Sequence, residues 1–345
     1  MPGVTKEQVI AALSQVQDPE LHRDLVSLNM IKDIEISGST VALTVELTTP
    51  ACPLRQQIQR DVENALLALQ GVDSVEVTMG ARVPEDKKIK DLAIKNIIAV
   101  GSGKGGVGKS TVAVNLAVGL AQCGAKVGLL DADIYGPNVP MMMGVEGLPP
   151  AKQGQGFQPA QAHGVKVMSI GFIVGQGEPL IWRGPMLHSA IKQFLRDVAW
   201  GELDYLIIDL PPGTGDVQLS LVQTVPLSGG VIVTMPQQVS FDDAARAVSM
   251  FKKLEVPILG VVENMSYLEM GDGSRRQLFG EGGGEQLAGL AGVPLLANLP
   301  IEERVREGGD QGVPVVIAEP DSPSGQALMG LATSIAARMS MLTLG

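Results

Sequence analysis

The sequence predicts an α/β protein with a mostly parallel sheet covered by helices on both faces, preceded by a small α+β domain. Hydrophobic residues make up 45% of the chain and aromatic residues only 3%, so the core must be largely aliphatic. In the larger, C-terminal part, short and nearly continuous apolar runs alternate with helical patterns, as in parallel strands buried on both faces. The 42 glycines suit tight turns between such strands and helices.

Residues 1–80 are expected to form the small α+β domain. Thr5 is placed to cap a helix over residues 6–16, with Gln8 at the capping-box position. The segment Asp18-Pro19-Glu20 predicts a turn. The rest of the pattern predicts two strands at 31–36 and 41–47, a helix over 53–70 and a third strand at 72–78.

A polar linker is expected over residues 81–95, and the larger domain over residues 96–345. The Gly-, Pro- and Gln-rich segment 144–164 is interpreted as a surface excursion of that domain. Apolar runs predict its strands, at 97–100, 126–130, 165–170, 205–209, 230–234, 258–262 and 294–297.

The composition argues against several classes of partner. The chain has 26 basic and 37 acidic residues, a net charge of −11, which disfavours a nucleic-acid coat or an anionic membrane surface. The N-terminal segment lacks the pattern of a secretory signal, and no apolar run reaches the roughly 18 residues that span a bilayer. We therefore expect a cytoplasmic protein with no nucleic-acid partner and no stable membrane association.

The strand predicted at 97–100 runs directly into GSGKGGVGKST, which matches the phosphate-loop pattern G-x-x-x-x-G-K-[ST]. Glycines let backbone N–H groups face phosphate oxygens, and the following helix directs its positive end at the same anion. Lys109 is expected to contact the β- and γ-phosphates, Ser110 to ligate Mg²⁺ and Thr111 to contact the α-phosphate. The predicted nucleotide-binding residues of the loop are Gly103, Lys104, Gly105, Gly106, Val107, Gly108, Lys109, Ser110 and Thr111.

Four residues are predicted to be catalytic. Lys104 is a second lysine inside the loop, which defines the deviant form of the motif; the alternative is a solvated loop charge. Asp133 and Asp209 follow apolar strands, where carboxylates can organise Mg²⁺ and water. The predicted set is therefore Lys104, Lys109, Asp133 and Asp209, with Ser110 and Asp209 binding Mg²⁺. Asp216 lies after a glycine-containing loop and is either part of a phosphate sensor or a helix cap.

The segment Val262-Glu263-Asn264-Met265-Ser266 bears on the choice of base. Guanine-specific relatives of this loop usually carry an Asn-Lys-x-Asp run, and the aspartate is missing here. We therefore predict that the nucleotide is ATP and that Asn264 contacts the adenine. The alternative is that Asn264 is a turn residue.

At these motifs the chain resembles the Mrp/ApbC family of iron–sulfur cluster carrier ATPases. The resemblance rests on GSGKGGVGKST, LLDADIYGPNVP, IIDLPPGTGD, GVVENMS and FGEGGGEQLA, and covers nearly the whole chain. The N-terminal part resembles the small cluster-assembly domain often fused in front. The family resemblance implies a homodimer in which Lys104 reaches the partner's nucleotide. It also implies a bridging iron–sulfur cluster that is exchanged with scaffold proteins and apoprotein recipients.

The cysteines depart from the family pattern. Many members carry a Cys-x-x-Cys after the Asn-Met-Ser segment, but this chain has only two cysteines, Cys52 and Cys123, and neither lies there. Cys52 is the candidate Fe–S ligand, because it precedes Pro53 at an expected helix start that would stabilise its thiolate; a structural role is the alternative. Cys123 is expected to be a packed hydrophobic residue.

Two other functions remain as alternatives to a cluster carrier. The first is a spatial-regulator ATPase like MinD or ParA, which binds membrane or DNA. An apolar helix over 325–344 has Leu328, Leu331 and Ile335 on one face but carries little positive charge for an anionic membrane. The second alternative is an insertase ATPase for another metal or anion cargo.

Overall fold

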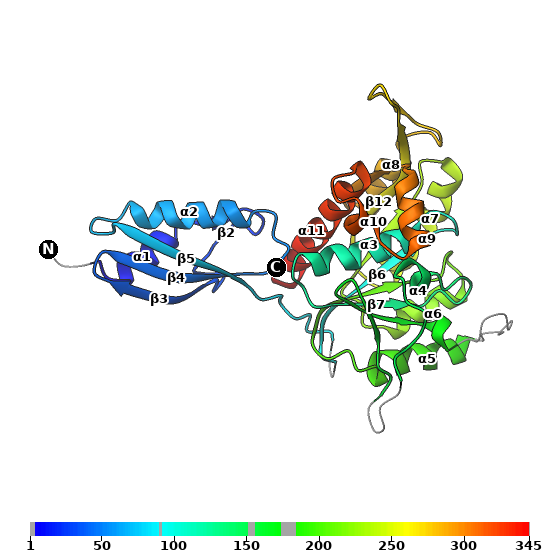
Figure 1. Ribbon diagram of the computed structural model, residues 1–345, viewed down its shortest axis with the longest axis horizontal. Helices are drawn as coiled ribbons and strands as arrows, with labels where there is room; N and C mark the ends of the chain where they lie inside the picture. Colours follow the sequence, from blue (N-terminus) through cyan, green and yellow to red (C-terminus); the bar gives the residue numbers. More distant parts are fainter. Residues whose placement is uncertain (1–3, 90–91, 151–155, 174–183, 345) are drawn as a thin grey trace. The chain divides into compact units, whose positions relative to one another are not determined.

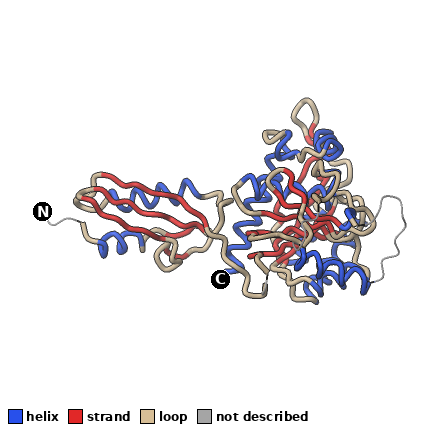
Figure 2. The backbone as a smooth tube through the Cα atoms, turned by 60° about the horizontal axis from the view of Figure 1, so that its bottom comes forward, coloured by secondary structure: helices blue, strands red, loops and turns tan. Residues whose placement is uncertain are grey.

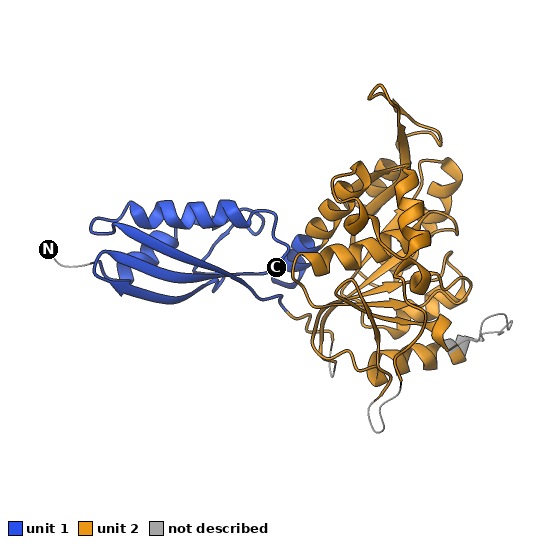
Figure 3. Ribbon diagram, in the orientation of Figure 1, with its two compact units in different colours: residues 1–84, 336–345 blue, residues 85–335 orange. Residues whose placement is uncertain are grey.

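The structure is a computed structural model that describes residues 4–89, 92–150, 156–173 and 184–344. It divides into two compact units, one of residues 1–84 with 336–345 and one of residues 85–335 (Figure 3). The second unit contains the large sheet and carries the nucleotide-loop motif.

The first unit is the small α+β fold that was predicted. The helix α1 (Lys6–Leu13) begins with the predicted capping box, in which the Thr5 hydroxyl accepts from the Gln8 backbone and the Gln8 side chain accepts from Thr5 N–H. Asp18 Oδ1 accepts from the backbone N–H groups of Glu20 and Leu21, which forms the predicted turn. The other elements are β1 (Gln17–Asp18), β2 (Arg23–Asp24), β3 (Ile31–Ser37), β4 (Thr40–Leu47), α2 (Arg55–Leu67) and β5 (Ser74–Ala81).

The sheet of the first unit has the order β3-β4-β5, antiparallel between β3 and β4 and parallel between β4 and β5 (Figure 1). Alternate residues of β4 are buried, from Val41 to Leu47, as expected for a strand with one face on the core. Ile58, Val62 and Leu66 of α2 belong to the same core, so an amphipathic helix covers that face.

The second unit is the predicted mostly parallel α/β sheet. Its strand order is β13-β12-β11-β6-β10-β7-β9-β8, with β14 paired to β12. Pairing is parallel throughout, except that β8 and β13 are antiparallel to their neighbours. The strands are β6 (Ile94–Ser102), β7 (Val127–Asp131), β8 (Ala160–Ala162), β9 (Val165–Ser169), β10 (Leu203–Asp209), β11 (Gly229–Thr234), β12 (Ile258–Glu269), β13 (Arg275–Arg276) and β14 (Leu295–Pro300).

Helices cover both faces of this sheet (Figure 2). One core cluster joins α5, α6, α7 and α8 to the strands, while α3 packs on β6, β7 and β10 and contacts α10. The helices are α3 (Lys109–Gln122), α4 (Val139–Met142), α5 (Gly184–Asp197), α6 (Asp216–Thr224), α7 (Gln238–Lys253), α8 (Gly283–Ala291), α9 (Glu303–Gln311), α10 (Val315–Ala318) and α11 (Pro323–Leu344), with a 3-10 turn η1 (Ile170–Phe172).

All seven predicted strands of the large domain are present, and two features differ from expectation. β12 continues to Glu269, well past the predicted end at residue 262, because it gains hydrogen-bonded partners in β13 and β14. The excursion predicted over 144–164 contains β8, which pairs with β9 at the sheet edge; residues 151–155 of that excursion lie outside the described part.

By length and composition alone α11 could cross a membrane, with a mean hydropathy of 1.4 over its best window, which the expected lack of an apolar run of that length did not anticipate. Within that window, 44% is buried inside the protein, and Leu328, Leu331 and Ile335 are fully covered. The core helix of a soluble protein can have the same length and composition.

Candidate nucleotide site

The predicted phosphate loop connects the central strand β6 to α3, where the positive end of α3 faces the loop. Gly106 and Gly108 have φ values of +78° and +83°, in the left-handed region that glycine enters without strain. Gly103 packs against the α7 backbone so closely that a Cβ would lie 2.1 Å from the carbonyl carbon of Asp243. The glycines are therefore required by the backbone path and by close packing.

Lys109 is the centre of a buried charge cluster. Its side chain is only 6% exposed, and its Nζ lies 2.7 Å from Asp209 Oδ1 and 3.4 Å from Asp133 Oδ2. Ser110 donates its hydroxyl to Asp209 Oδ2 at 2.6 Å. The structure therefore brings together four predicted site residues that lie up to 100 positions apart in the sequence.

Burial and these contacts act on the pKa of Asp209 in opposite directions, and the net effect is a raised pKa. Complete burial raises the pKa of this carboxyl, whereas the Lys109 charge and the hydrogen bonds from Lys109 and Ser110 lower it. The Ser110 hydroxyl and the Asp209 carboxylate form an adjacent pair of hard oxygen donors, which is the chemistry that Mg²⁺ prefers. The residues present thus fit the predicted magnesium role.

Asp131 is a site residue that the sequence analysis did not select, although it stands in the same Asp131-Ala132-Asp133 segment. It is fully buried and accepts hydrogen bonds from the Ser169 hydroxyl and from the backbone N–H of Asp133 and Val139. Burial, followed by the nearby charge of Asp209, raises the pKa of Asp131 to about 8. Asp131 therefore orients the loop that carries Asp133. Its position at the end of a buried strand was the available signal.

Asn264 bridges β12 and the phosphate loop. Its Nδ2 donates to the Val107 carbonyl at 2.8 Å, and its Oδ1 accepts from the Met265 N–H at 2.9 Å. Met265 has a φ of +55° within β12, and the pairing of β12 with β14 is irregular between Glu263 and Tyr267. Asn264 also lines a cavity of about 470 Å³, together with Gly108, Thr111, Met141, Met142 and Pro300. The cavity lies beside the loop, but the adenine contact stays a prediction.

Among the described residues, Lys104 and Asp216 form no ion pair with the charge cluster. Lys104 is partly exposed and forms no ion pair with any residue that the structure describes. Asp216 is exposed and is the first residue of α6, just after Gly215. The loop between β10 and α6 is joined to the end of β6, directly before the phosphate loop, through the Gly213 N–H, which donates to the Ser102 carbonyl at 3.1 Å.

The two cysteines are both free and partly buried. Burial raises the pKa of Cys52 to about 11, and the charges of Glu20 and Asp18 add to that effect. The Leu54 N–H and Arg55 lower it by less, so the expectation of a thiolate stabilised by the helix start is wrong. Burial also raises the pKa of Cys123, at the end of α3. Among the described residues, no three His, Cys, Asp or Glu side chains are grouped to bind a metal ion.

The fold and this loop define the class of the protein, a P-loop NTPase. A family model described as NUBPL iron-transfer P-loop NTPase matches residues 93–336, and one described as iron-sulfur cluster assembly protein matches residues 6–79. The chain belongs to this iron-transfer family of P-loop NTPases, as the sequence resemblance predicted.

Individual relatives agree with this assignment. A protein of Synechocystis sp. named iron-sulfur cluster carrier protein is 53% identical to this chain over 99% of both chains. A protein of Deinococcus radiodurans with the same name is 53% identical over 98% of this chain and 97% of its own. Among solved structures, a nucleotide-binding protein of Archaeoglobus fulgidus in complex with ADP has a TM-score of 0.57 at 42% identity, covering 64% of this chain and 87% of that one. MinD of Pyrococcus horikoshii with Mg-ADP has a TM-score of 0.55 at 28% identity, covering 69% and 94%.

Proposed function

We propose that this protein is an ATP-dependent iron–sulfur cluster carrier, which binds a cluster and passes it to apoproteins while hydrolysing ATP. The observation that carries the proposal is the combination, in one chain, of a complete phosphate-loop charge cluster with near full-length identity of 53% to proteins named as cluster carriers. The cluster is the cargo, taken from scaffold proteins and delivered to recipients.

The nucleotide roles follow from the contacts of Lys109. Phosphate oxygens that enter the loop compete with Asp209 and Asp133 for the Lys109 ammonium, so binding exchanges one set of charge pairs for another. Ser110 and Asp209 are the residues that would hold Mg²⁺, which neutralises phosphate charge when bound. Asp133, whose carboxylate accepts from the backbone N–H groups of Tyr135 and Gly136, would orient the attacking water.

The homodimer is the second part of the proposal. Lys104 is partly exposed on the loop and makes no ion pair among the described residues, so its charge is available to a partner chain's phosphates. ATP bound between two copies would then place each Lys104 at the other copy's site. A cytoplasmic location, without nucleic acid or stable membrane binding, fits the net charge of −11.

The cargo site is proposed to include Cys52 from each copy, with exogenous thiols or other side chains as further ligands. Cys52 has acidic neighbours in Asp18 and Glu20, which raise the pKa of the free thiol but favour a cationic metal centre at the same position. Incomplete ligation by protein thiolates leaves positions that a recipient's thiolates can attack.

The test is anaerobic reconstitution followed by iron and sulfide analysis, Mössbauer spectroscopy and ATP hydrolysis. Cys52→Ser and Cys123→Ser form a matched pair, because both cysteines are partly buried and free. Iron per chain should fall in Cys52→Ser only. Equal iron in both variants and wild type excludes Cys52. No cluster in wild type, with ATP-dependent pelleting on liposomes or DNA, would instead support the MinD- or ParA-like alternative, whereas another bound metal or anion would support the insertase.

A further inference from the structure

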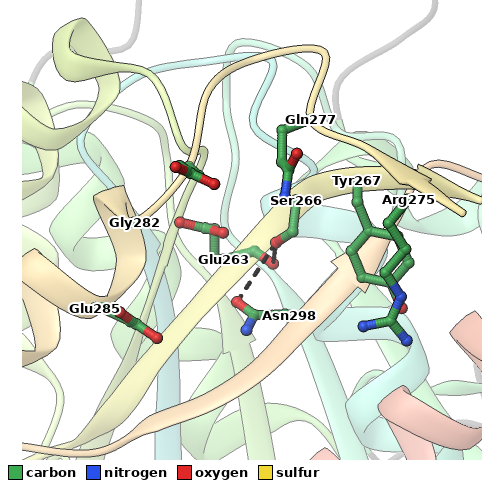
Figure 4. Close-up of a pocket in the computed structure, with 9 residues that line it drawn as sticks. Glu263, Ser266, Tyr267, Arg275, Gln277, Gly282, Glu285 and Asn298 are labelled. Carbon is green, nitrogen blue, oxygen red and sulfur yellow. Dashed lines mark hydrogen bonds between the residues drawn. The ribbon is translucent and has the colours of Figure 1, made fainter.

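Polar side chains that are buried in a protein ordinarily have a hydrogen-bond partner. In the cavity of about 410 Å³ at the start of α8, the buried Glu263 carboxylate accepts the Gly284 N–H at 2.6 Å. Figure 4 shows the Ser266 hydroxyl beside it, bonded to Glu263 and Asn298. The start of α6 differs, because its buried polar side chain, Gln218, has no partner among the described residues.

Gln218 occupies a core position of α6. It is only 1% exposed, and Leu221 and Val222 follow it at the spacing of a buried helical face. A Cβ added to Gly101 would lie 3.3 Å from the Gln218 amide nitrogen, so the amide rests against β6, the strand that leads into the phosphate loop. Neither the nitrogen nor the oxygen of this amide is bonded to a described residue. An aliphatic side chain would fill the position without the cost of an unpaired buried amide.

The place of Gln218 in the helix shows what its amide can reach. Gln218 is the third residue of α6, after the N-cap Gly215, and a glutamine at this position can reach back to the backbone N–H of the N-cap. In α1, Gln8 stands at the same position and accepts the Thr5 N–H at 2.9 Å. The start of α6 has no such hydrogen bond from a side chain. Gln218 therefore has the placement of a capping residue, but its amide is turned inward.

The loop between β10 and α6 is loosely packed at its glycines and begins at the charge cluster. A Cβ on Gly213 or on Gly215 would meet nothing within 4 Å. The Gly213 N–H joins the loop to β6 through the Ser102 carbonyl. At its other end the loop follows directly on Asp209, which pairs with Lys109. Phosphate that competes for Lys109 therefore changes the contacts of the residue from which this loop starts.

Building on the ATP binding of the proposed function, we propose that Gln218 is a positioning residue whose amide becomes paired when ATP binds. As the loop shifts, the amide oxygen accepts the Gly215 N–H, in the way that Gln8 caps α1. The amide nitrogen then donates to the Ser102 carbonyl in place of the Gly213 N–H. This pairing holds the loop and the start of α6 in the ATP-bound arrangement and so favours the binding of ATP.

Removal of the Gln218 amide should therefore act on two quantities in opposite directions. Without nucleotide, the protein should become more stable, because no buried amide is left unpaired in α6. ATP should bind more weakly, because the arrangement that ATP favours loses the hydrogen bonds of the amide. A glutamine that only filled space would not give this combination, since a side chain of the same length without an amide would leave the affinity for ATP unchanged.

The test is calorimetric titration of the full chain with the non-hydrolysable analogue AMP-PNP and Mg²⁺, together with unfolding in urea without nucleotide. Gln218→Met keeps the length of the side chain and removes the amide. Its affinity for AMP-PNP should fall about 5- to 150-fold, the range for one buried polar group left unpaired, while its midpoint of unfolding in urea rises. The matched control is Gln8→Met, which removes an amide that is already paired at the same helix position. Its urea midpoint should fall and its affinity for AMP-PNP should stay the same.

The pairing itself is observed by NMR of protein labelled with nitrogen-15 in its glutamine side chains. The NH₂ signal of Gln218, assigned by its absence in Gln218→Met, should move downfield when AMP-PNP is added, while that of Gln8 stays in place. An unchanged affinity or a lower urea midpoint in Gln218→Met, or a Gln218 signal that does not move, overturns the proposal; Gln218→Leu replaces Gln218→Met if the latter does not fold. Any of these results in a wild type that binds AMP-PNP refutes the pairing alone, whereas a wild type that binds no AMP-PNP refutes the proposed function with it.

Discussion

Replacement of Lys109 by alanine is expected to destabilise the second unit as well as to abolish tight ATP binding. The ammonium lies 2.7 Å from Asp209 Oδ1 and 3.4 Å from Asp133 Oδ2, and all three side chains are buried. At an effective dielectric constant of about 20, each attraction amounts to about 5–6 kcal/mol before desolvation is subtracted. The net effect of removing one partner of a buried pair is smaller, about 3–5 kcal/mol, because the remaining charges stay buried.

For a unit of this size, that loss corresponds to a fall in Tm of about 6–20 °C. The assay is calorimetric unfolding of the nucleotide-free protein at several pH values, with Lys104→Ala as the control for loss of a loop lysine that has no ion pair among the described residues. Loss of the Lys109 charge raises the pKa of Asp209 further, so the deficit in Tm should shrink as the pH falls and the carboxyl takes up a proton. A Tm for Lys109→Ala within a degree or two of that for Lys104→Ala at neutral pH would refute the reasoning.

Three further outcomes are expected. The pKa of Asp131 is raised to about 8, so this carboxyl lowers the stability of the folded chain as the pH rises from about 4 to 8. The Tm of Asp131→Asn should therefore rise relative to that of wild type over this pH range. A Tm difference that does not change with pH would contradict this. Gln218→Leu should raise the free energy of unfolding, measured in urea, by about 1–3 kcal/mol, because the side-chain amide nitrogen and oxygen of Gln218 are both buried without a partner among the described residues. A free energy of unfolding lower than that of wild type would show that water satisfies the amide. Mixing Lys104→Ala with Asp209→Asn chains should restore part of the ATPase activity, because one site of the mixed dimer keeps both residues; no recovery counts against action of Lys104 on the partner's site.

The strands and the phosphate loop were predictable because their signals are local. Each predicted strand of the large domain is an apolar run that can be recognised within one short stretch of sequence, and the loop motif is contiguous from Gly103 to Thr111. The extension of β12 to Glu269 was not predictable in this way. Residues 263–269 are mostly polar, and they form strand only because β13 and β14 supply hydrogen-bond partners.

The site was predicted as a set of residues but not as a set of contacts. That Lys109 pairs with both Asp133 and Asp209 depends on β6, β7 and β10 lying side by side, with Asp209 opposite Asp131 in the register. Asp131 was missed for the same reason, because its partner Ser169 lies on β9 and only the sheet order brings them together. Motifs identify the candidate site residues, whereas the order of the strands in the sheet determines which of these residues are buried and which contact one another.

Cys52 shows how burial changes the chemistry that a motif predicts. From the sequence, a helix start beside Pro53 favoured a thiolate, but the folded chain buries the sulfur near Asp18 and Glu20 and raises its pKa to about 11. If Cys52 is a cluster ligand, iron must therefore displace a proton that the protein holds tightly, and cluster loading should become more favourable as the pH rises. The same proton returns when the cluster leaves, which makes release to a recipient's thiolates easier than from a preformed thiolate site. A raised pKa at this cysteine is thus compatible with transient binding of cargo.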